Sequence, residues 1–213
     1  MPRKARATAG REGDAAVVLR EHLLDTADRL LAEGDVGSIT ARALARAADV
    51  SDGVLYNHFA DKNDLLLQAL VRRFGRLVDE FQAAVPAVGG GTVEESLDTL
   101  AQALLALHGA AFPLIAKLLA QPALLQRFLV EIHASSEPFG GKLIRDLVVD
   151  FVTAEQRTGR LAGGDPEAAA DLLIGGVAVI ALPFVGAARG DRLNALVETL
   201  LDGLDHSKGR DTR

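Results

Sequence analysis

The chain has 213 residues and a mass of 22.4 kDa, which fits one large domain or two small ones. Hydrophobic residues make up 49% and charged residues 24%, so the chain has enough apolar surface for a core and wholesale disorder is excluded. The net charge of −6 excludes a generally basic polymer binder, and the absence of Cys excludes a disulfide scaffold, a thiolate metal site and a cysteine nucleophile.

The first twelve residues are basic, although the chain as a whole is acidic. They contain four Lys or Arg and one Glu, whereas residues 1–73 as a whole hold 11 basic and 11 acidic residues. We interpret residues 1–16 as a flexible basic arm, which either contacts DNA phosphates or the minor groove or is an ordinary solvated terminus. No signal peptide is expected, because no apolar run follows the basic start.

Four helices with short connections are predicted in the first part of the chain. Apolar residues recur at the helical spacing from Leu23 to Leu31, and Gly34 ends the first helix. Side chains that can cap a helix stand before each of the following ones. These caps and helices are Ser38 or Thr40 before about 40–47, Ser51 before about 52–59, and Asp61 before a helix that runs to Pro86.

Beyond Pro86 the apolar period stays helical and no alternating run favours a sheet, so the predicted fold class is all-α. The glycines at 89–91 form a loop or hinge and not a phosphate-binding loop, because the chain has no G-x-x-x-x-G-K-[ST] sequence. Pro113, Pro122 and Pro138 are expected at or near helix starts. The helices predicted here are about 93–108, 112–119, 122–134, 138–158, 165–187 and 191–204.

One segment is apolar enough to raise the question of a membrane span. Leu172 to Ala188 contains 17 residues without a charge, which is at the lower limit for a spanning helix. The segment includes Gly175, Gly176 and Pro183, and no Trp or Tyr flanks it. Burial inside the protein is therefore favoured over insertion into a membrane.

Residues 39–66 carry the most informative pattern in the chain. Two short helices joined by a tight turn match a helix-turn-helix, in which the second helix can enter a DNA major groove. Leu55 and Phe59 are one helical turn apart and are expected to pack inward. Gly53 and Val54 are small enough to let the start of this helix approach base edges.

At this point the sequence resembles the tetracycline-repressor (TetR) family of transcriptional regulators. The resemblance covers residues 17–70 specifically, and the rest of the chain is similar in length and in its helical character. We therefore expect a helix-turn-helix DNA-binding domain at 17–65, a ligand-binding and dimerisation domain at 66–206 and a disordered tail at 207–213. The matching motifs are Val50-Ser51-x-Gly53-x-Leu55-Tyr56-x-His58-Phe59-x-x-Lys62-x-x-Leu65 and the upstream Ile39-Thr40-Ala41-Arg42-x-Leu44-Ala45.

The resemblance implies which residues contact DNA. Some match positions that hold operator phosphates, others match positions that face bases, and Ser51 matches the cap of the recognition helix. Tyr56 and His58 are core residues instead if the match is coincidental. The phosphate positions are Thr40, Tyr56, His58 and Lys62, the base-facing positions are Arg42, Asp52, Gly53 and Val54, and Asn57 completes the expected DNA-binding set.

Two acidic residues are unusual in this pattern. Many members of the family have Gly in the turn where this chain has Asp49, and Asp tolerates a left-handed conformation better than most residues. Asp52 either accepts a hydrogen bond from a cytosine amino group or caps the helix and only repels phosphate. Of these two roles for Asp52, we favour capping.

The larger domain is expected to bind a small apolar effector, because it lacks the charge for a polyanionic ligand and holds many apolar side chains. The scarcity of aromatic residues, 4% of the chain, favours an aliphatic or lipid-like molecule. His108 and His133 either line this pocket or are ordinary histidines satisfied within the fold. The candidate ligand-binding residues are Gln102, His108, Phe112, Leu119, Leu125, Phe128 and His133.

The resemblance also suggests a homodimer interface of four helices, two from each subunit. The apolar helices near 143–152 and 172–185 either supply this interface or belong to the core. Gly175 and Gly176 would allow a close approach of helices. The candidate interface residues are Leu143, Leu147, Phe151, Leu172, Gly176 and Val179.

No pattern of catalysis or metal binding is found in the sequence. Histidine pairs with H-x-x-x-H spacing and a G-x-S-x-G nucleophile motif are both absent, so no metal, cofactor or enzyme activity is predicted. We predict a cytoplasmic bacterial regulator, nucleoid-associated when bound, that binds a palindromic operator in double-stranded DNA as a homodimeric repressor and is released by its effector, with no membrane partner. The alternatives are a helical-bundle enzyme or small-molecule carrier without DNA binding, and a membrane-associated protein that uses residues 172–188.

Overall fold

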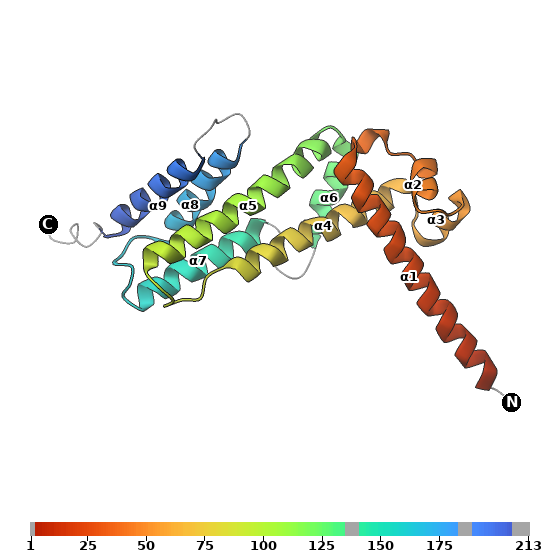
Figure 1. Ribbon diagram of the computed structural model, residues 1–213, viewed down its shortest axis with the longest axis horizontal. Helices are drawn as coiled ribbons and strands as arrows, with labels where there is room; N and C mark the ends of the chain where they lie inside the picture. The colour runs from red at the N-terminus through yellow and green to blue at the C-terminus, as the bar shows by residue number, and fades with distance from the viewer. Residues whose placement is uncertain (1–2, 135–140, 183–188, 206–213) are drawn as a thin grey trace. The chain divides into compact units, whose positions relative to one another are not determined.

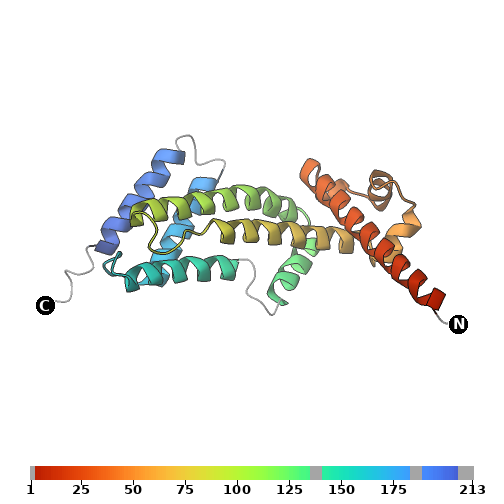
Figure 2. The same ribbon diagram turned by 60° about the horizontal axis from the view of Figure 1, so that its bottom comes forward.

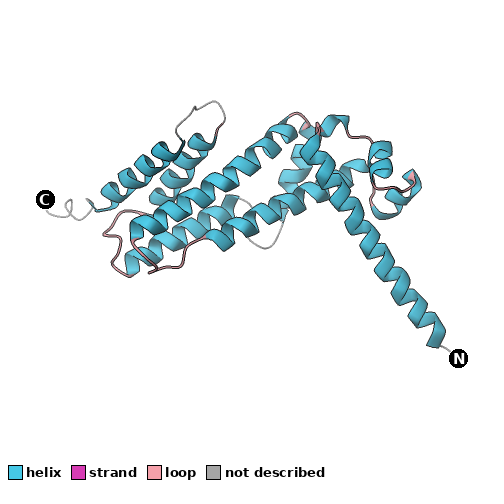
Figure 3. Cartoon of the chain, viewed as in Figure 1, coloured by secondary structure: helices cyan, strands magenta, loops and turns pink. Residues whose placement is uncertain are grey.

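The computed structural model describes residues 3–134, 141–182 and 189–205, and the side chains within 14–132, 141–182 and 190–204. The elements in chain order are α1 (Arg3–Glu33), η1 (Val36–Ser38), α2 (Ala41–Ala47), α3 (Asp52–His58), α4 (Lys62–Ala84), α5 (Val93–Leu119), α6 (Pro122–Ala134), α7 (Gly141–Arg157), α8 (Pro166–Ala181) and α9 (Arg189–Asp205) (Figure 1). No β-strand occurs in these described ranges, which confirms the all-α class (Figure 3). The tail expected at 207–213 lies outside the described residues.

The described residues fold as two compact units. Unit 1 comprises residues 1–73 and 116–134, and unit 2 comprises 74–115 and 135–213. This division differs from the predicted boundary at residue 65, because the end of α5 and the whole of α6 group with the first helices. One reason lies at Lys117, whose Nζ donates hydrogen bonds to the carbonyl oxygens of Leu31 (2.6 Å) and Ala32 (3.1 Å) at the end of α1. A cation is favourable at this helix end, where carbonyl groups lack partners.

In unit 1, α1 packs against α2, and α2 packs against α3 (Figures 1 and 2). The apolar stripe predicted on α1 is buried from Leu23 to Leu31, with Leu30 half-buried. Two side chains of α1 reach the last carbonyl groups of α2. His22 Nε2 donates to the Ala48 oxygen at 3.0 Å, and Arg29 donates to the Ala47 oxygen at 3.4 Å. These bonds satisfy acceptors that the end of a short helix leaves unpaired.

Local capping explains where several helices begin. Thr40 Oγ1 accepts a hydrogen bond from the Ala43 N–H, and Asp61 Oδ1 accepts one from the Asp64 N–H, so both predicted caps are confirmed. Ser38 is not the cap of α2, because it lies within η1 and its hydroxyl donates to the Asp35 carbonyl.

The turn between α2 and α3 contains Asp49 in a left-handed conformation, with φ of 55°. The Val50 N–H bonds to the Ala45 carbonyl and the Asp49 N–H to the Arg46 carbonyl, which together form a Schellman motif. The expectation that Asp49 supports the turn in place of Gly is therefore confirmed. No other non-glycine residue among those described has a positive φ, so Asp49 is the position where the backbone of this turn is strained.

The boundaries of two helices differ from the predicted ones, and the predicted start at 138 of a third lies outside the described residues. Helix α1 begins at Arg3, so the residues expected to form an arm before position 17 are helical, although side chains up to residue 13 are not described. Helix α5 runs unbroken through Pro113, where two helices were expected. The apolar spacing continues across the proline, with Ala111 and Leu114 both buried, so packing outweighs one lost hydrogen bond. Helix α7 begins at Gly141, and residues 138–140 lie outside the described part.

Among the described helices, α5 is long and apolar enough to cross a membrane, with a mean hydropathy of 1.5 over its most apolar window. Leu97, Leu100 and Leu104 on this helix are fully buried within the protein, as in the core helix of a bundle. The apolar segment that the sequence analysis considered as a membrane span, residues 172–188, does not form one long helix in the described residues. Helix α8 has 16 residues and ends at Ala181, short of the length for a span, while residues 183–188 are not described.

In unit 2, α7 packs against α8, and α8 packs against α9. The loop before α5 is fixed to α7 by Glu155, whose side chain is fully buried. Glu155 Oε1 accepts a hydrogen bond from the Gly89 N–H at 3.1 Å, and the Arg160 guanidinium lies 3.4 Å from both carboxylate oxygens. Arg160 also donates to the Gly91 carbonyl at 2.8 Å. The glycine run predicted as a loop or hinge is therefore a loop that the buried carboxylate of Glu155 and the half-buried Arg160 tie to the core.

Replacement of Asp49 tests the strain in the turn. We expect Asp49→Gly to be at least as stable as the wild type, because Gly adopts positive φ without a steric penalty. Asp49→Val should lower the free energy of unfolding by about 1–3 kcal/mol. Urea unfolding followed by circular dichroism measures both. Asp79→Val, which removes an exposed acid from the middle of α4, is the control and should change stability by roughly 0.5 kcal/mol or less. Equal stability of the Gly and Val variants at position 49 would contradict the assignment.

Removal of the Glu155 carboxylate should unlock the loop before α5. We expect Glu155→Ala to lower the free energy of unfolding by about 1–3 kcal/mol, because it removes the acceptor of the Gly89 N–H and the ionic partner of the half-buried Arg160. Glu198→Ala removes an exposed carboxylate and should have an effect of about 0.5 kcal/mol or less. Denaturant unfolding measures the difference, and equal effects of the two substitutions would refute a structural role for Glu155.

Candidate nucleic-acid interface

Helix α3 has one buried side and one open side. Leu55 is fully buried and Phe59 nearly so, as predicted from their spacing. The Arg20 guanidinium lies 5.1 Å from the centre of the Phe59 ring, a cation–π contact that ties the end of α3 to α1. These contacts hold α3 in place without using the residues on its other side.

The open side of α3 consists of Asp52, Gly53, Tyr56 and Asn57, which are all exposed. They recur at intervals of one, three and four residues and so share one helical face. Tyr56 is 54% exposed, and the alternative in which it is a core residue is therefore wrong. Val54 and His58 are half-buried at the edges of this face. The structure thus brings together on one surface most of the residues predicted to face DNA from α3.

The first turn of α3 differs from the expectation for its acid. Ser51 occupies the N-cap position, but its side chain makes no capping hydrogen bond. Asp52 is the first residue inside the helix, and no hydrogen bond or ion pair to a described residue involves its carboxylate. The favoured interpretation of Asp52 as a cap is therefore wrong. A negative charge in the first turn is still favourable to the helix dipole.

Gly53 lies in open space. A Cβ atom built on it would meet no atom of the protein within 4 Å, and its backbone φ is not positive. Neither the conformation nor the packing of this chain therefore requires Gly at position 53. Because Gly lowers helix stability relative to Ala, its presence on the open face is best explained by the close approach of another molecule.

Two of the residues predicted to contact DNA, Thr40 and Arg42, lie at the start of α2. Thr40 caps the helix, as described above, and is exposed at the same time. Arg42 is exposed on the first turn. Arg46, one turn further and also exposed, was missed by the sequence reasoning. The spacing of Arg42 and Arg46, which places both on one face, was the signal that could have identified the pair.

Lys62 has an internal partner. Its Nζ donates a hydrogen bond of 2.6 Å to the carbonyl of Ile39, the C-cap of η1, and so fixes the start of α4 to the segment that leads into α2. The side chain is half-buried, yet an ammonium group has three donors. Lys62 can therefore both position α2 and donate to a phosphate.

Three acids of α1 are paired with arginines inside unit 1. Arg72 pairs with Glu21 and Asp25, and Arg73 pairs with Asp28 at 3.0 Å. Both arginines belong to α4, so these three acids are balanced by a helix other than α3. The absence of a net positive charge over residues 1–73 therefore does not make the face of α3 acidic, apart from Asp52 itself.

Two of the predicted ligand-binding residues meet on α5. The rings of His108 and Phe112 are 5.2 Å apart in an edge-to-face arrangement. His108 Nδ1 lies 2.7 Å from the Leu104 carbonyl, so in the neutral ring Nδ1 carries the proton and Nε2 is left as an acceptor. Burial lowers the pKa of His108, against the opposite effect of the bond to Leu104. A neutral histidine next to a phenyl ring suits a weakly polar ligand.

The other candidates for ligand binding are not gathered with this pair. Leu119, Leu125 and Phe128 belong to unit 1, where Leu119 is exposed, Leu125 half-buried and Phe128 buried. Gln102 is an exposed residue of α5 in unit 2, and the side chain of His133 lies outside the described part. The structure describes these positions without joining them into one pocket.

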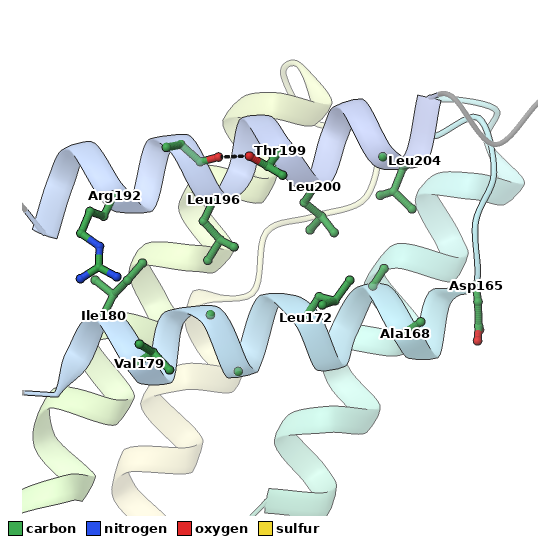
Figure 4. Close-up of a pocket in the computed structure, with 15 residues that line it drawn as sticks. Asp165, Ala168, Leu172, Val179, Ile180, Arg192, Leu196, Thr199, Leu200 and Leu204 are labelled. Carbon is green, nitrogen blue, oxygen red and sulfur yellow. Dashed lines mark hydrogen bonds between the residues drawn. The ribbon is translucent and has the colours of Figure 1, made fainter. Parts of the chain in front are cut away.

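An apolar groove runs between α8 and α9, and we call it the α8–α9 groove. It has a volume of about 760 Å³, and most of its lining side chains are apolar. Figure 4 shows Leu196, Leu200 and Leu204 of α9 directed toward α8. Leu172 and Val179, two turns apart on α8, are 65% and 48% exposed. Large apolar side chains that remain exposed along one face are typical of an interaction surface.

The predicted interface residues are divided by the structure. Leu172, Gly176 and Val179 line the α8–α9 groove. Phe151 is only 3% exposed and packs in the core of unit 2, so its assignment to a surface interface is wrong. Leu143 and Leu147 are half-buried on α7.

The role of the two glycines and of α9 also differs from the expectation. A Cβ atom at Gly176 would lie 2.7 Å from Leu196 Cδ2, so Gly176 permits the packing of α9 of the same chain. Gly175 has open space around it. The contribution of α9, including Arg192 and Thr199, was missed, although the apolar period of this helix is visible in the sequence.

No group of His, Asp and Glu side chains that could hold a metal ion is found among the residues whose side chains are described. Acidic residues near the start of α5 and on α9 line a small surface pocket. The candidate interaction surfaces in the described part of the chain are therefore the open face of α3 and the α8–α9 groove.

Comparison with known proteins agrees with this geometry. Residues 23–69 match the family model described as bacterial regulatory proteins, tetR family. The chain is 39% identical over 70 residues to the HTH-type transcriptional regulator AcrR of Shigella flexneri, which is 32% of this chain and 33% of AcrR. It is 35% identical over 79 residues to the HTH-type transcriptional repressor KstR of Mycolicibacterium smegmatis, which is 37% of this chain and 38% of KstR. The matched region thus spans about a third of each of these relatives.

The fold extends the likeness to the remainder of the chain. A solved structure from Mesorhizobium loti, described as a TetR-family transcriptional regulator, superposes with a TM-score of 0.70 at 17% identity. The superposition covers 88% of this chain and 97% of that one. The relatives are named as regulators and not as enzymes, in agreement with the prediction that this chain is not an enzyme. The chain is therefore similar to the tetR family of bacterial regulatory proteins in its helix-turn-helix segment, residues 23–69, and shares its overall fold with a solved structure described as a member of that family.

Proposed function

We propose that the chain is a homodimeric transcriptional repressor that binds a palindromic operator through α3 and leaves it when a small apolar effector binds. The observation that carries this proposal is the open face of α3, where Asp52, Gly53, Tyr56 and Asn57 are exposed while Leu55 is buried. A recognition helix needs this arrangement, because its base-reading side chains must be free of the fold. The name of KstR as a repressor supports the sign of regulation.

Contacts to the DNA backbone are assigned to Tyr56, which can donate its hydroxyl, and to Lys62, which has donors beyond the bond to Ile39. The exposed Arg42 of α2 is proposed to face a base, and the exposed Arg46 can add a contact to the backbone. If a dimer makes about six phosphate contacts, its affinity should fall roughly 10³-fold between about 50 and 200 mM salt. Regulators of this family bind DNA in the cytoplasm, and we propose the same location for this chain, in association with the nucleoid.

A second copy of the chain is the proposed occupant of the α8–α9 groove. A palindromic operator requires two recognition helices related by a two-fold axis, so the protein must present a self-complementary surface. The exposed Leu172 and Val179 and the open space at Gly175 offer an apolar surface of this kind. Burial of these side chains against their symmetry mates would supply a hydrophobic driving force.

The effector is proposed to bind in unit 2 close to His108 and Phe112, where a half-buried aromatic pair offers an apolar wall with one acceptor. Helix α5 connects this site to unit 1 through the chain itself, because residues 93–115 belong to unit 2 and 116–119 to unit 1. A shift of α5 would move Lys117, which holds the carbonyl groups at the end of α1. This route gives the effector a physical means to change the position of α1.

The experiment that tests the function is selection of bound fragments from random duplex DNA by the full-length protein, followed by footprinting at two salt concentrations. We expect a protected palindrome and the steep loss of affinity with salt given above. Gly53→Ala sharpens the test, since it should raise helix stability by up to about 1 kcal/mol and yet weaken operator binding tenfold or more by adding a methyl group at the interface.

The matched control for this substitution is Gly109→Ala. Gly109 also lies inside a helix, is exposed, and has open space around its Cβ position. This variant should gain stability but retain operator affinity. Operator binding of Gly53→Ala with the affinity of the wild type would contradict a close approach of α3 to DNA, and a folded wild-type chain that selects no sequence would contradict the proposed function.

The dimer is tested by a charge placed in the α8–α9 groove. We expect Leu172→Asp to dissociate the protein into monomers and to abolish footprinting, because a carboxylate would be buried against an apolar surface. Leu119→Asp is the control, since Leu119 is 63% exposed, close to the 65% of Leu172, but lies outside the groove. Size-exclusion chromatography with light scattering measures both. A wild-type monomer, or an unchanged dimer for Leu172→Asp, would refute this interface.

A further inference from the structure

Asp52 is the one exposed carboxylate on α3, and neither the fold nor the contacts proposed above explain it. Two acids at other helix starts act as caps, because Asp61 accepts a hydrogen bond from the Asp64 N–H and Asp165 accepts one from the Glu167 N–H. Ser51 fills the N-cap position of α3, and Asp52 follows it with no hydrogen bond or ion pair to any described residue. A role as a cap or in an ion pair would have left one of these signs.

A carboxylate on a face that approaches DNA lowers affinity for every sequence, because the phosphates repel it. Its presence is favourable only where the bound DNA offers a hydrogen-bond donor to compensate for its lost hydration. In the major groove the donors are the amino groups of cytosine and adenine. Adenine presents its N7 acceptor beside that amino group and so repels a carboxylate, whereas cytosine presents no acceptor beside its own amino group. The chemistry therefore favours cytosine.

The surroundings of Asp52 allow such a contact. Gly53, the next residue, has open space around its Cβ position, so a base edge can reach the first turn of the helix. No described basic side chain pairs with Asp52, so the charge is not neutralised before DNA binds. Ser51 leaves its hydroxyl outside the capping bond and therefore does not lock the turn through its side chain.

We propose that Asp52 is a specificity-determining residue that selects cytosine at one position of each operator half-site by accepting a hydrogen bond from its exocyclic amino group. This inference rests on the proposed DNA-binding function and extends it to one base. The same carboxylate rejects other DNA through its repulsion of phosphates. Asp52 thus trades general affinity for discrimination.

The test is selection from random duplex DNA by the full-length wild type, by Asp52→Asn and by Asp52→Ala. Asp79→Asn serves as the matched control, because it makes the same change of charge on an exposed residue of α4 outside α3. We expect a fixed cytosine in each half-site selected by the wild type and by Asp79→Asn. The cytosine should be lost with Asp52→Ala and should change toward adenine with Asp52→Asn, since an amide pairs with the adenine edge.

Affinity measurements on one operator complete the test. Replacement of the fixed C·G pair by T·A should weaken wild-type binding on the order of tenfold or more and should leave binding by Asp52→Ala unchanged. Both variants should bind unrelated DNA more tightly than the wild type, because a repulsive charge is gone.

The possible outcomes separate this inference from the function on which it rests. A wild type that selects a palindrome, with the same base preferences in Asp52→Ala, overturns the role of Asp52 and leaves the proposed function in place. A folded wild type that selects no sequence overturns both. Loss of the cytosine preference in Asp52→Ala alone, with the palindrome retained, supports the inference.

Discussion

The open face of α3 depends on the burial of Leu55 and Phe59 on the opposite side of the helix, because α3 has only seven residues and needs this packing to stay folded. An isolated helix shorter than about 12 residues is marginal in water, so α3 exists through its anchorage. The Schellman turn at Asp49 sets the direction in which the chain enters α3, and the ring of Phe59 closes its end against Arg20. Because the buried side of α3 holds the helix in place, the side chains on its open face are not needed for packing and are available to a partner.

Carboxylates have two different uses in this protein. Most of those discussed serve the fold, either as helix caps such as Asp61, as surface pairs such as Asp28 with Arg73, or as the buried partner of Arg160 in the case of Glu155. Asp52 serves none of these purposes within the described residues. The contrast matters because an unpaired charge on a binding face is unfavourable until a partner satisfies it. A charge that caps no helix and forms no ion pair, such as that of Asp52, is therefore a candidate for base specificity.

The candidate sites were predictable to different degrees. The motif at 39–66 predicted which side of α3 is buried, since its short helices leave few ways to bury Leu55 and Phe59. The ligand and interface residues were less predictable, because long helices that are apolar over a wide arc do not reveal which side meets the core. Phe151 and Leu172 are both large apolar residues within apolar helices, yet Phe151 is buried and Leu172 is exposed.

The sequence by itself determined the helical class, most of the helix ends and the conformation of the turn at Asp49, because these features arise from groups within about four residues of each other. Tertiary structure alone decided the continuity of α5 through Pro113, the grouping of residues 116–134 with unit 1 and the burial of Glu155. Each of these depends on contacts between segments far apart in the chain, such as Lys117 with the end of α1. The spacing of residues within one segment does not predict which distant segment will contact it.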